Sequence, residues 1–389
     1  MTLELNKLTE TVQAMGRELA ANTRERANLV DLAREWLVTY ADQGDRLQQP
    51  ARSIHAAIPT AEPMNAVFPQ PALPSTFTII GADGSQIQPD RHAAALYYLI
   101  NVGSIVYRHG SGQAPETHSE PSLGYKEDDL YEQGRLVAGN LLDVRRDLAE
   151  VTTLADRCEE QQDGPIVALV DGTLLLWILE DRTAEWQRKK VDTYTEQLRR
   201  IQQVGPKATV ASFTSRPRRT EVTRLLYLAS ADGDAERARQ STNPLERVPD
   251  RWVFATLPPG ARSALFVSPA PINHEHYAPE GQTIHFFYLN VAREGEKPAI
   301  ARIECPEWVA AERDLLDFVH GAVVDQARIT GEYPYALARA DELAFVSGRE
   351  RRAFAEMVNT ALLSAGVIGE PSPKAYQKTL TRRGRRRIR

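Results

Sequence analysis

The sequence predicts an α/β protein with a sheet flanked by helices, because strand-like and helix-like patterns alternate from Phe77 onward. Its 389 residues, 42% hydrophobic and 25% charged, can bury one large core or two modest ones. In chain order, the expected strands are 77–82, 93–107, 165–170, 207–213, 263–268, 283–292 and 299–304. The expected helices lie near 127–160, 185–203, 218–230, 308–329, 334–346 and 349–364.

The regions on either side of this core have a different composition. Residues 3–50 carry apolar side chains at helical spacing, which predicts an N-terminal helical arm over 1–56 that packs on a protein partner. Residues 57–75 hold five prolines and are expected to be an extended connector. The core domain then spans 76–373. Residues 374–389 contain eight Lys or Arg and no acid, which predicts a flexible tail that contacts DNA or an assembly partner.

Several classes of protein are disfavoured by composition. No stretch approaches the roughly 20 apolar residues of a membrane helix, and no signal-peptide core is evident, so a cytoplasmic protein without membrane contact is expected. Cys158 and Cys305 lie in unrelated contexts, which argues against a disulfide framework or a zinc site. A net charge of −5 leaves room only for local basic patches. The sequence has no P-loop motif, so any ATP-driven movement requires a partner.

Two aspartates occupy positions suited to metal chemistry. Asp83 and Asp171 each follow an apolar run and precede a glycine, which lets the backbone pass close to a metal or phosphate. Between them, a long helical pattern carries Arg146 and, one turn later, Glu150. Three carboxylates from strand, helix and strand could hold one or two divalent ions that position water and neutralise a phosphodiester. These residues therefore predict a hydrolytic metal site.

Each of these signals also has a structural alternative. Asp-Gly is the commonest hairpin turn, and the apolar run 174–179 after Asp171 would suit a second hairpin strand. A Glu on an amphipathic helix usually faces solvent, and the same helix offers other acids. These are Asp147, Glu159 and Glu160.

Other patterns give weaker predictions. A histidine-rich segment could bind metal, but His-x-His beside a loop is more often incidental. Its members are His274, Glu275, His276 and His285. Three arginines at the start of a predicted helix could grip backbone phosphates or simply form a solvated face. They are Arg216, Arg218 and Arg219. Three tryptophans on apolar runs are expected to serve the core. They are Trp177, Trp186 and Trp308.

The order of short motifs from about residue 77 to 347 resembles the NurA nuclease family. The matching segments are Ala82-Asp-Gly-Ser85, the pair Arg146 and Glu150, Asp171-Gly-Thr-Leu174, the serine-plus-basic segment 212–224, Arg302 to Trp308, and Gly331-Glu-Tyr-Pro-Tyr-Ala-Leu-Ala-Arg-Ala340 followed by Asp341. Asp341 stands where the family usually shows histidine. An aspartate keeps a hard-metal site possible but removes a candidate general acid.

This resemblance implies an RNase H-like core with a mixed sheet, and a deoxyribonuclease of the 5′–3′ exonuclease and single-strand endonuclease type that uses Mn²⁺ or Mg²⁺. It also implies a homodimer docked on a hexameric HerA-type ATPase, in double-strand break resection or anti-phage defence. The implied catalytic residues are Asp83, Glu150, Asp171, Tyr333 and Asp341, of which all but Tyr333 are metal ligands. The implied DNA contacts are Ser85, Arg146, Arg216, Arg218 and Arg219.

A second class of function stays open at this point. A catalytically reduced adaptor with the same fold could bind DNA and close the end of a motor without cutting. The two classes differ in whether the carboxyl groups of Asp83, Glu150, Asp171 and Asp341 converge on one cluster.

Overall fold

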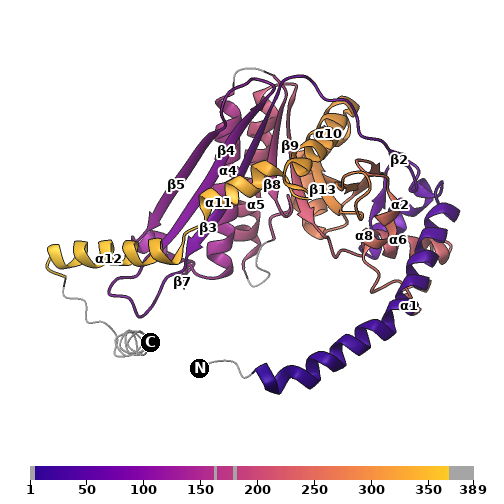
Figure 1. The fold of residues 1–389 in the computed structure, drawn as a ribbon, viewed down its shortest axis with the longest axis horizontal. Helices are drawn as coiled ribbons and strands as arrows, with labels where there is room; N and C mark the ends of the chain where they lie inside the picture. Colours follow the sequence, from indigo (N-terminus) through magenta and orange to yellow (C-terminus); the bar gives the residue numbers. More distant parts are fainter. Residues whose placement is uncertain (1–4, 162–163, 178–181, 368–389) are drawn as a thin grey trace. The chain divides into compact units, whose positions relative to one another are not determined.

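The computed structural model describes residues 5–161, 164–177 and 182–367, without the side chains of 21–24, and the predicted basic tail at 374–389 lies outside this part (Figure 1). The chain forms two compact units. Unit 1 consists of Met1–Leu73 and Ser212–Tyr333, and unit 2 of Pro74–Ala211 and Pro334–Arg389. Within the described ranges, no helix is both long and apolar enough to span a bilayer.

Unit 2 is built on a mixed sheet. Its strands β3 (Phe77–Ile87), β4 (Tyr98–His109) and β5 (Glu116–Gly124) form an antiparallel meander. Strand β8 (Ile166–Asp171) lies parallel to β3 on its other side, followed by β9 (Ala208–Ser215), which gives the order β9-β8-β3-β4-β5. Helices α4 (Asn140–Glu159) and α5 (Ala184–Val204) connect the later strands. This topology confirms the predicted RNase H-like core.

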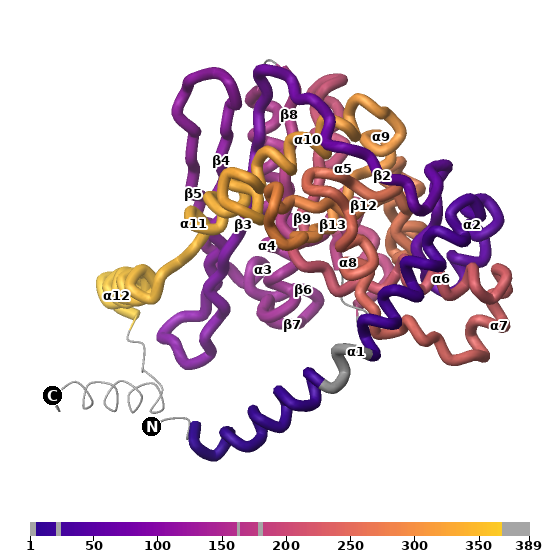
Figure 2. Tube along the Cα trace, turned by 45° about the vertical axis from the view of Figure 1, so that its right-hand side comes forward, coloured from indigo at the N-terminus to yellow at the C-terminus, as the bar shows by residue number. Residues whose placement is uncertain are grey.

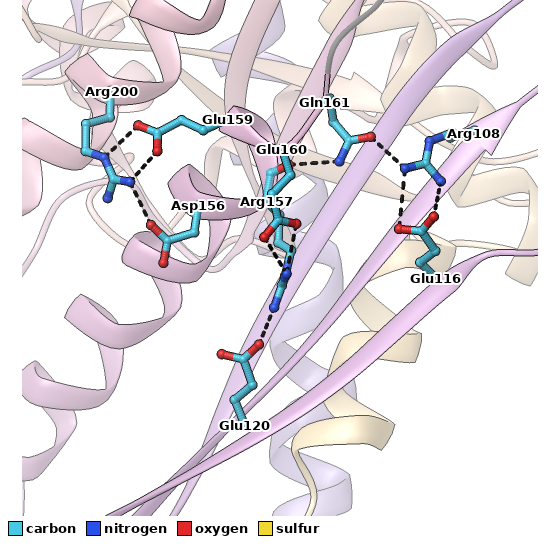
Figure 3. Close-up of polar contacts among 9 residues, drawn as sticks. All are labelled: Arg108, Glu116, Glu120, Asp156, Arg157, Glu159, Glu160, Gln161 and Arg200. Carbon is cyan, nitrogen blue, oxygen red and sulfur yellow. Dashed lines mark hydrogen bonds and ion pairs between the residues drawn. The ribbon is translucent and has the colours of Figure 1, made fainter.

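Ion pairs fasten the C-terminal end of α4 to its neighbours in unit 2 (Figure 3). Arg200 on α5 pairs with Glu159 and Asp156 of α4, with N–O distances of 2.6 and 2.7 Å. Arg157 of α4 reaches Glu120 on β5. Exposed pairs of this kind each stabilise a fold by less than about 1 kcal/mol. Together they link the C-terminal end of α4 to β5 and α5.

Helix α11 (Tyr335–Ala344) lies directly on β3 and β4, at positions where both strands carry glycine. A Cβ at Gly103 would come within 2.4 Å of the Ala340 carbonyl oxygen, and one at Gly81 within 2.8 Å of that of Ala336. Real Cβ atoms essentially never approach a backbone atom so closely. The two glycines therefore let α11 approach the sheet at backbone contact distance.

Unit 1 has its own strands and helices around a separate core. Strand β12 (Ile284–Asn290) pairs antiparallel with β13 (Ile300–Pro306), and β13 pairs with the last four residues of β9. On the other side of β12 lie β11 (Phe266–Val267), β1 (Ile58–Pro59) and the pair β10 (Arg262–Ser263) and β2 (Val67–Phe68). The helices of unit 1 are α1 (Thr9–Thr39), α2 (Gly44–Ser53), α6 (Glu221–Ser230), α7 (Ala235–Gln240), α8 (Asp250–Val253), α9 (Glu307–Ala310) and α10 (Arg313–Thr330).

The N-terminal helices divide into an exposed and a buried part. From Val30 onward, α1 and α2 bury Val30, Ala33 and Leu47 in the core of unit 1, beside α6 and α8. The first turns of α1 carry exposed apolar side chains instead. The expected connector at 57–75 contributes β1 and β2 to the same unit. Only the start of the predicted arm therefore projects from the core, as the indigo tube of Figure 2 shows.

Two elements of unit 2 differ from the expected ones. The helix expected over 127–160 is broken into α3 (Glu127–Leu130), a small hairpin of β6 (Tyr131–Glu132) and β7 (Arg135–Leu136), and α4. Gly134 and Gly139 both adopt positive φ there, which interrupts a helix. The edge strand β5 was not expected, because its polar, exposed residues show no strand pattern. Helix α12 (Gly348–Ser364), by contrast, confirms the helix expected near 349–364 and begins at a capping box of Ser347 and Glu350.

Candidate active site

Asp83 and Asp171 become neighbours through the parallel pairing of β3 and β8. The last residues paired in this register are Ala82 and Val170, so each aspartate is the next residue along its strand. Asp171 ends β8 as predicted, whereas Asp83 lies within β3, which continues to Ile87 in its pairing with β4. The expectation that both acids end a strand is therefore wrong for Asp83, because the meander extends β3 beyond the end of its parallel partner.

The hairpin alternative for Asp171 does not hold. Residues 172–177 form no strand. Gly172 adopts a φ of +93°, a backbone conformation that residues with a side chain rarely adopt. The apolar side chains of Leu174, Leu175 and Leu176 are buried instead in the loop that follows. Asp171 therefore stands at a true strand end.

Helix α4 brings Glu150 to the same place. Its carboxylate Oε1 lies 3.1 Å from Nε of Arg146, one turn earlier on the helix, and its side chain is only 13% exposed. A Cβ at Gly84 would lie 2.6 Å from this Oε1 and 2.7 Å from Cγ of Arg146. The glycine after Asp83 thus provides the space in which Glu150 and Arg146 approach β3.

Asp341 completes the group from α11. It lines one cavity of about 430 Å³ together with Asp83, Glu150 and Asp171. The Asp83 carboxyl lies within hydrogen-bonding reach of the Asp341 carboxyl, and its Oδ1 accepts a bond of 2.8 Å from the Gly84 amide. Four acids from four different elements of unit 2 therefore surround a single cavity.

The crowding of carboxylates changes their ionisation. Burial, with the charges of Asp171 and Asp341, raises the pKa of Asp83 to about 6, although the Gly84 amide acts in the opposite direction. Burial also raises the pKa of Glu150 well above its ordinary value, and Asp147, Asp83 and Asp171 add to the shift while Arg146 opposes it. Clusters of perturbed acids in a cavity are typical of functional sites.

The way in which the stability of the metal-free protein changes with pH should therefore depend on the ionisation of Asp83. Because its folded pKa of about 6 lies above the ordinary 3.8, the folded state holds more protons between these values than the unfolded state does. The free energy of unfolding should accordingly fall as pH rises through this window. Urea unfolding in EDTA should show a weaker fall for Asp83→Asn than for the unaltered protein. Equal pH profiles would contradict the proposed crowding.

The donor set suits a hard divalent cation. Carboxylate oxygens are the ligands that Mg²⁺ and Mn²⁺ prefer. Arg146, which also lines the cavity, places one positive charge beside these carboxylates. Within residues 5–161, 164–177 and 182–367, however, no three acid, histidine or cysteine side chains already have the placement of ligands to one ion. The chemistry of the cavity fits a divalent metal, and binding would require the carboxylates to turn inward.

The other predicted site residues lie elsewhere. Ser85 Oγ donates to the carbonyl oxygen of Ala344, which ties β3 to α11. Tyr333 belongs to unit 1, where it packs edge-on against Phe213 and lines a different cavity with Arg216. Arg218 and Arg219 also belong to unit 1. The histidine-rich segment gathers no metal ligand set in the part of the chain that is described.

Asp147 and Trp177 also line the cavity, although the sequence did not assign either of them to the site. Asp147, which pairs with Arg146 at 2.9 Å, lines it and was named only as an alternative to Glu150. Trp177 lines it with a side chain that is 50% exposed, so its predicted place in the core is wrong. Trp186 is buried as expected. Since Trp177 follows three leucines, its pattern alone could not separate a core residue from a cavity residue.

The topology of the sheet, with acids gathered beside β3 and β8, places this protein in the class of RNase H-like folds. The chain belongs to the NurA family, because the NurA domain matches residues 77–346. Among solved structures, it is similar to the NurA nuclease from Sulfolobus solfataricus, with 12% identity, coverage of 90% of this chain and 98% of that one, and a TM-score of 0.48. A NurA structure bound to dAMP and manganese shares 11% identity over 93% and 98% of the two chains, with a TM-score of 0.42. No curated protein sequence matches.

Proposed function

We propose that this protein is a divalent-metal-dependent deoxyribonuclease that cleaves DNA at or near ends. The observation that carries the proposal is the single cavity lined by Asp83, Glu150, Asp171 and Asp341 in a NurA-family chain. With the 5′–3′ exonuclease and single-strand endonuclease activities implied by the family motifs, it would act in double-strand break resection or in defence against foreign DNA.

The residues of the cavity have distinct roles in this proposal. Asp83, Glu150, Asp171 and Asp341 would hold Mn²⁺ or Mg²⁺, which when bound activates water and neutralises the scissile phosphodiester. Arg146, held between Glu150 and Asp147, can release these acids to the metal and turn its guanidinium to a phosphate oxygen. Because Asp83 and Glu150 have raised pKa values, they can each carry a proton until the site fills.

The direct test is digestion of end-labelled DNA with Mn²⁺, Mg²⁺ or EDTA. Shortened products in either metal and none in EDTA are expected. Intact DNA in both metals would exclude the proposed activity. The same assay should include Tyr333→Phe. The catalytic role of Tyr333 rests on the family motif alone, and the residue lines a different cavity, in unit 1.

Trp177 is proposed as a platform for a base next to the scissile phosphate. A half-exposed indole beside carboxylates can stack on any base, which stabilises binding by about 1–3 kcal/mol per base. Trp177→Ala should raise KM for DNA about 10-fold with a small change in kcat, whereas Trp177→Phe should retain most of the affinity. Initial rates over a range of DNA concentrations measure this. A loss confined to kcat would assign Trp177 to another role.

Protein partners are proposed at the N-terminal helical stretch formed by the 3₁₀ helix Leu5–Leu8 and the start of α1. Five exposed apolar side chains there alternate at intervals of three and four residues, the spacing of a helix that packs on another helix. They are Leu5, Leu8, Val12, Met15 and Leu19. Together with the family motifs, this stripe supports a homodimer that docks on a HerA-type hexameric ATPase.

Deleting residues 1–20 should weaken assembly before it weakens cleavage in excess metal. A deletion up to Phe77 is unsuitable, because it also removes Leu47 and Met64 from the core of unit 1. Light scattering gives the mass of the assembly, and replacement of the exposed Gln13 by Ser serves as a control. An unchanged mass and unchanged ATPase binding would show that the stripe serves neither contact.

A DNA-binding adaptor without nuclease activity is the second candidate. It is favoured by the absence, in the described residues, of a ready-made ligand set, and by Asp341 at the position where the family shows histidine. Isothermal titration with Mn²⁺ separates the two candidates without relying on turnover. Binding that disappears in Asp171→Ala supports the nuclease, and no binding in the unaltered protein supports the adaptor.

A further inference from the structure

Arg251 in unit 1 lies beside the arginine-rich loop at 216–219, far from it in sequence. Its Nη1 donates to the Arg216 carbonyl oxygen at 3.0 Å, and the amide of Asp250 donates to the Arg219 carbonyl oxygen at 2.9 Å. Two hydrogen bonds thus fasten the start of α8 along the loop. Arg216 adopts a φ of +47°, which is uncommon for a residue with a side chain, and Arg251 helps to hold it there.

Among the described residues, acids do little to compensate the positive charge of Arg216 and Arg251. Arg216 meets Glu332 at 3.5 Å, but its side chain is 80% exposed, so the pair is weak. The nearest acid in sequence to Arg251 faces away. Asp250 is fully buried, where its carboxylate accepts from the amides of Val222 and Thr223 at 3.0 and 2.8 Å.

The guanidinium of Arg251 is also incompletely satisfied. Its Nε is buried and makes no hydrogen bond among the described residues. The pKa of Arg251 is lowered, first by burial and then by the charges of Arg218 and Arg216. The charges of Arg216 and Arg218 therefore disfavour the charged form of Arg251, and an anion bound among the three groups stabilises it.

We propose that Arg216, Arg218 and Arg251 form one binding site for the phosphodiester backbone of DNA, which Arg251 organises by holding the loop. The site deepens the proposed function, since it takes DNA as its ligand, and it adds a residue that the loop sequence alone does not reveal. The planar fork of arginine matches phosphate oxygens and reads no base, so binding here is independent of sequence. The guanidinium groups of Arg26 on α1 and of Arg251 both lie over the ring of Trp252, at 5.1 and 5.9 Å from its centre, so Arg26 is a further cation near this site.

The salt dependence of DNA binding tests this site. Fluorescence anisotropy of a labelled single-stranded oligonucleotide and of its duplex, in EDTA, gives affinity without cleavage. Each phosphate contact contributes about 0.7–0.9 to the slope of log K against log salt concentration. Arg251→Ala and Arg218→Ala should each lower the slope by about that amount and weaken binding several-fold at low salt, while Arg251→Lys should keep part of both.

Arg313→Ala is the control, because the side chain of Arg313 is exposed in unit 1 like that of Arg218 but lies on α10. Slopes unchanged in both cluster variants, or lowered equally by Arg313→Ala, would overturn the proposal. Thermal melting checks that Arg251→Ala is folded, and the exposed Arg218 tests the site if it is not. DNA that binds through this cluster but is never cut in Mn²⁺ would contradict the nuclease and not the phosphate site.

Discussion

Asp83→Ala and Asp171→Ala should each lower metal-dependent DNA cleavage by about 100-fold or more, with the fold intact. Removing a partner of a metal ligand already costs 10–100-fold, so loss of a ligand itself should cost at least the upper value. The expected loss is not structural, because both residues line the cavity and burial disfavours the charged form of the Asp83 carboxyl. Initial cleavage rates in Mn²⁺, with circular dichroism for the fold, measure both properties.

The control for these variants is Asp192→Asn. Asp192 lies on α5 of the same unit, with a side chain that is 49% exposed and a loose pair to Arg188 at 3.8 Å. Its loss should leave the rate unchanged. If either cavity variant retained full activity, the proposed metal site would be wrong, and the carboxylates would have to serve DNA-end binding or stability instead.

Gly103→Ala should destabilise unit 2 by about 1–3 kcal/mol and also reduce activity, because the new methyl group collides with α11. The colliding atoms are the Ala340 carbonyl oxygen and the Ala344 amide nitrogen, both at 2.4 Å, and neither can rotate away as a side chain could. Helix α11 must then lift from the sheet, and it carries Asp341 with it. Urea unfolding and the affinity for Mn²⁺ should therefore change together.

Gly16→Ala is the same chemical change, but we expect it to stabilise the protein. Gly16 lies in α1 with nothing within 4 Å of its added Cβ, so alanine should stabilise the helix by up to about 1 kcal/mol. A loss of stability at Gly103 no larger than the change at Gly16 would mean that α11 does not approach the sheet as closely as described.

Part of the candidate site could be predicted because the residues that carry its chemistry occupy recognisable patterns in the local sequence. Asp83 and Asp171 stand where apolar runs give way to polar residues, and Glu150 follows Arg146 by one helical turn. Those patterns survive folding because strand burial and helix periodicity are local properties. Asp341 came only from the resemblance to a family motif, since an acid on an amphipathic helix has no pattern that distinguishes a cavity from solvent.

The other features could not be predicted, because they depend on contacts between segments that are distant in the sequence. Nothing near Gly103 in the sequence indicates that a helix more than 200 residues later will rest on it. The interruption at 131–139 depends on two glycines whose positive φ a helical pattern does not reveal. In the same way, Arg251 shows no relation to Arg216 until α8 folds against the loop. Tertiary proximity, and not propensity, decides each of these cases.

The order in which the chain visits its two units has a consequence for biosynthesis. Unit 2 begins at Pro74, is interrupted after Ala211 by the second segment of unit 1, and resumes at Pro334. A ribosome therefore makes Asp83, Glu150 and Asp171 early but supplies α11 and Asp341 only after all of 212–333. Until then the glycine-lined face of β3 and β4 has no helix to cover it, and the acidic cavity lacks a wall. A nascent chain stalled within unit 1 would carry three of the four carboxylates and no completed site.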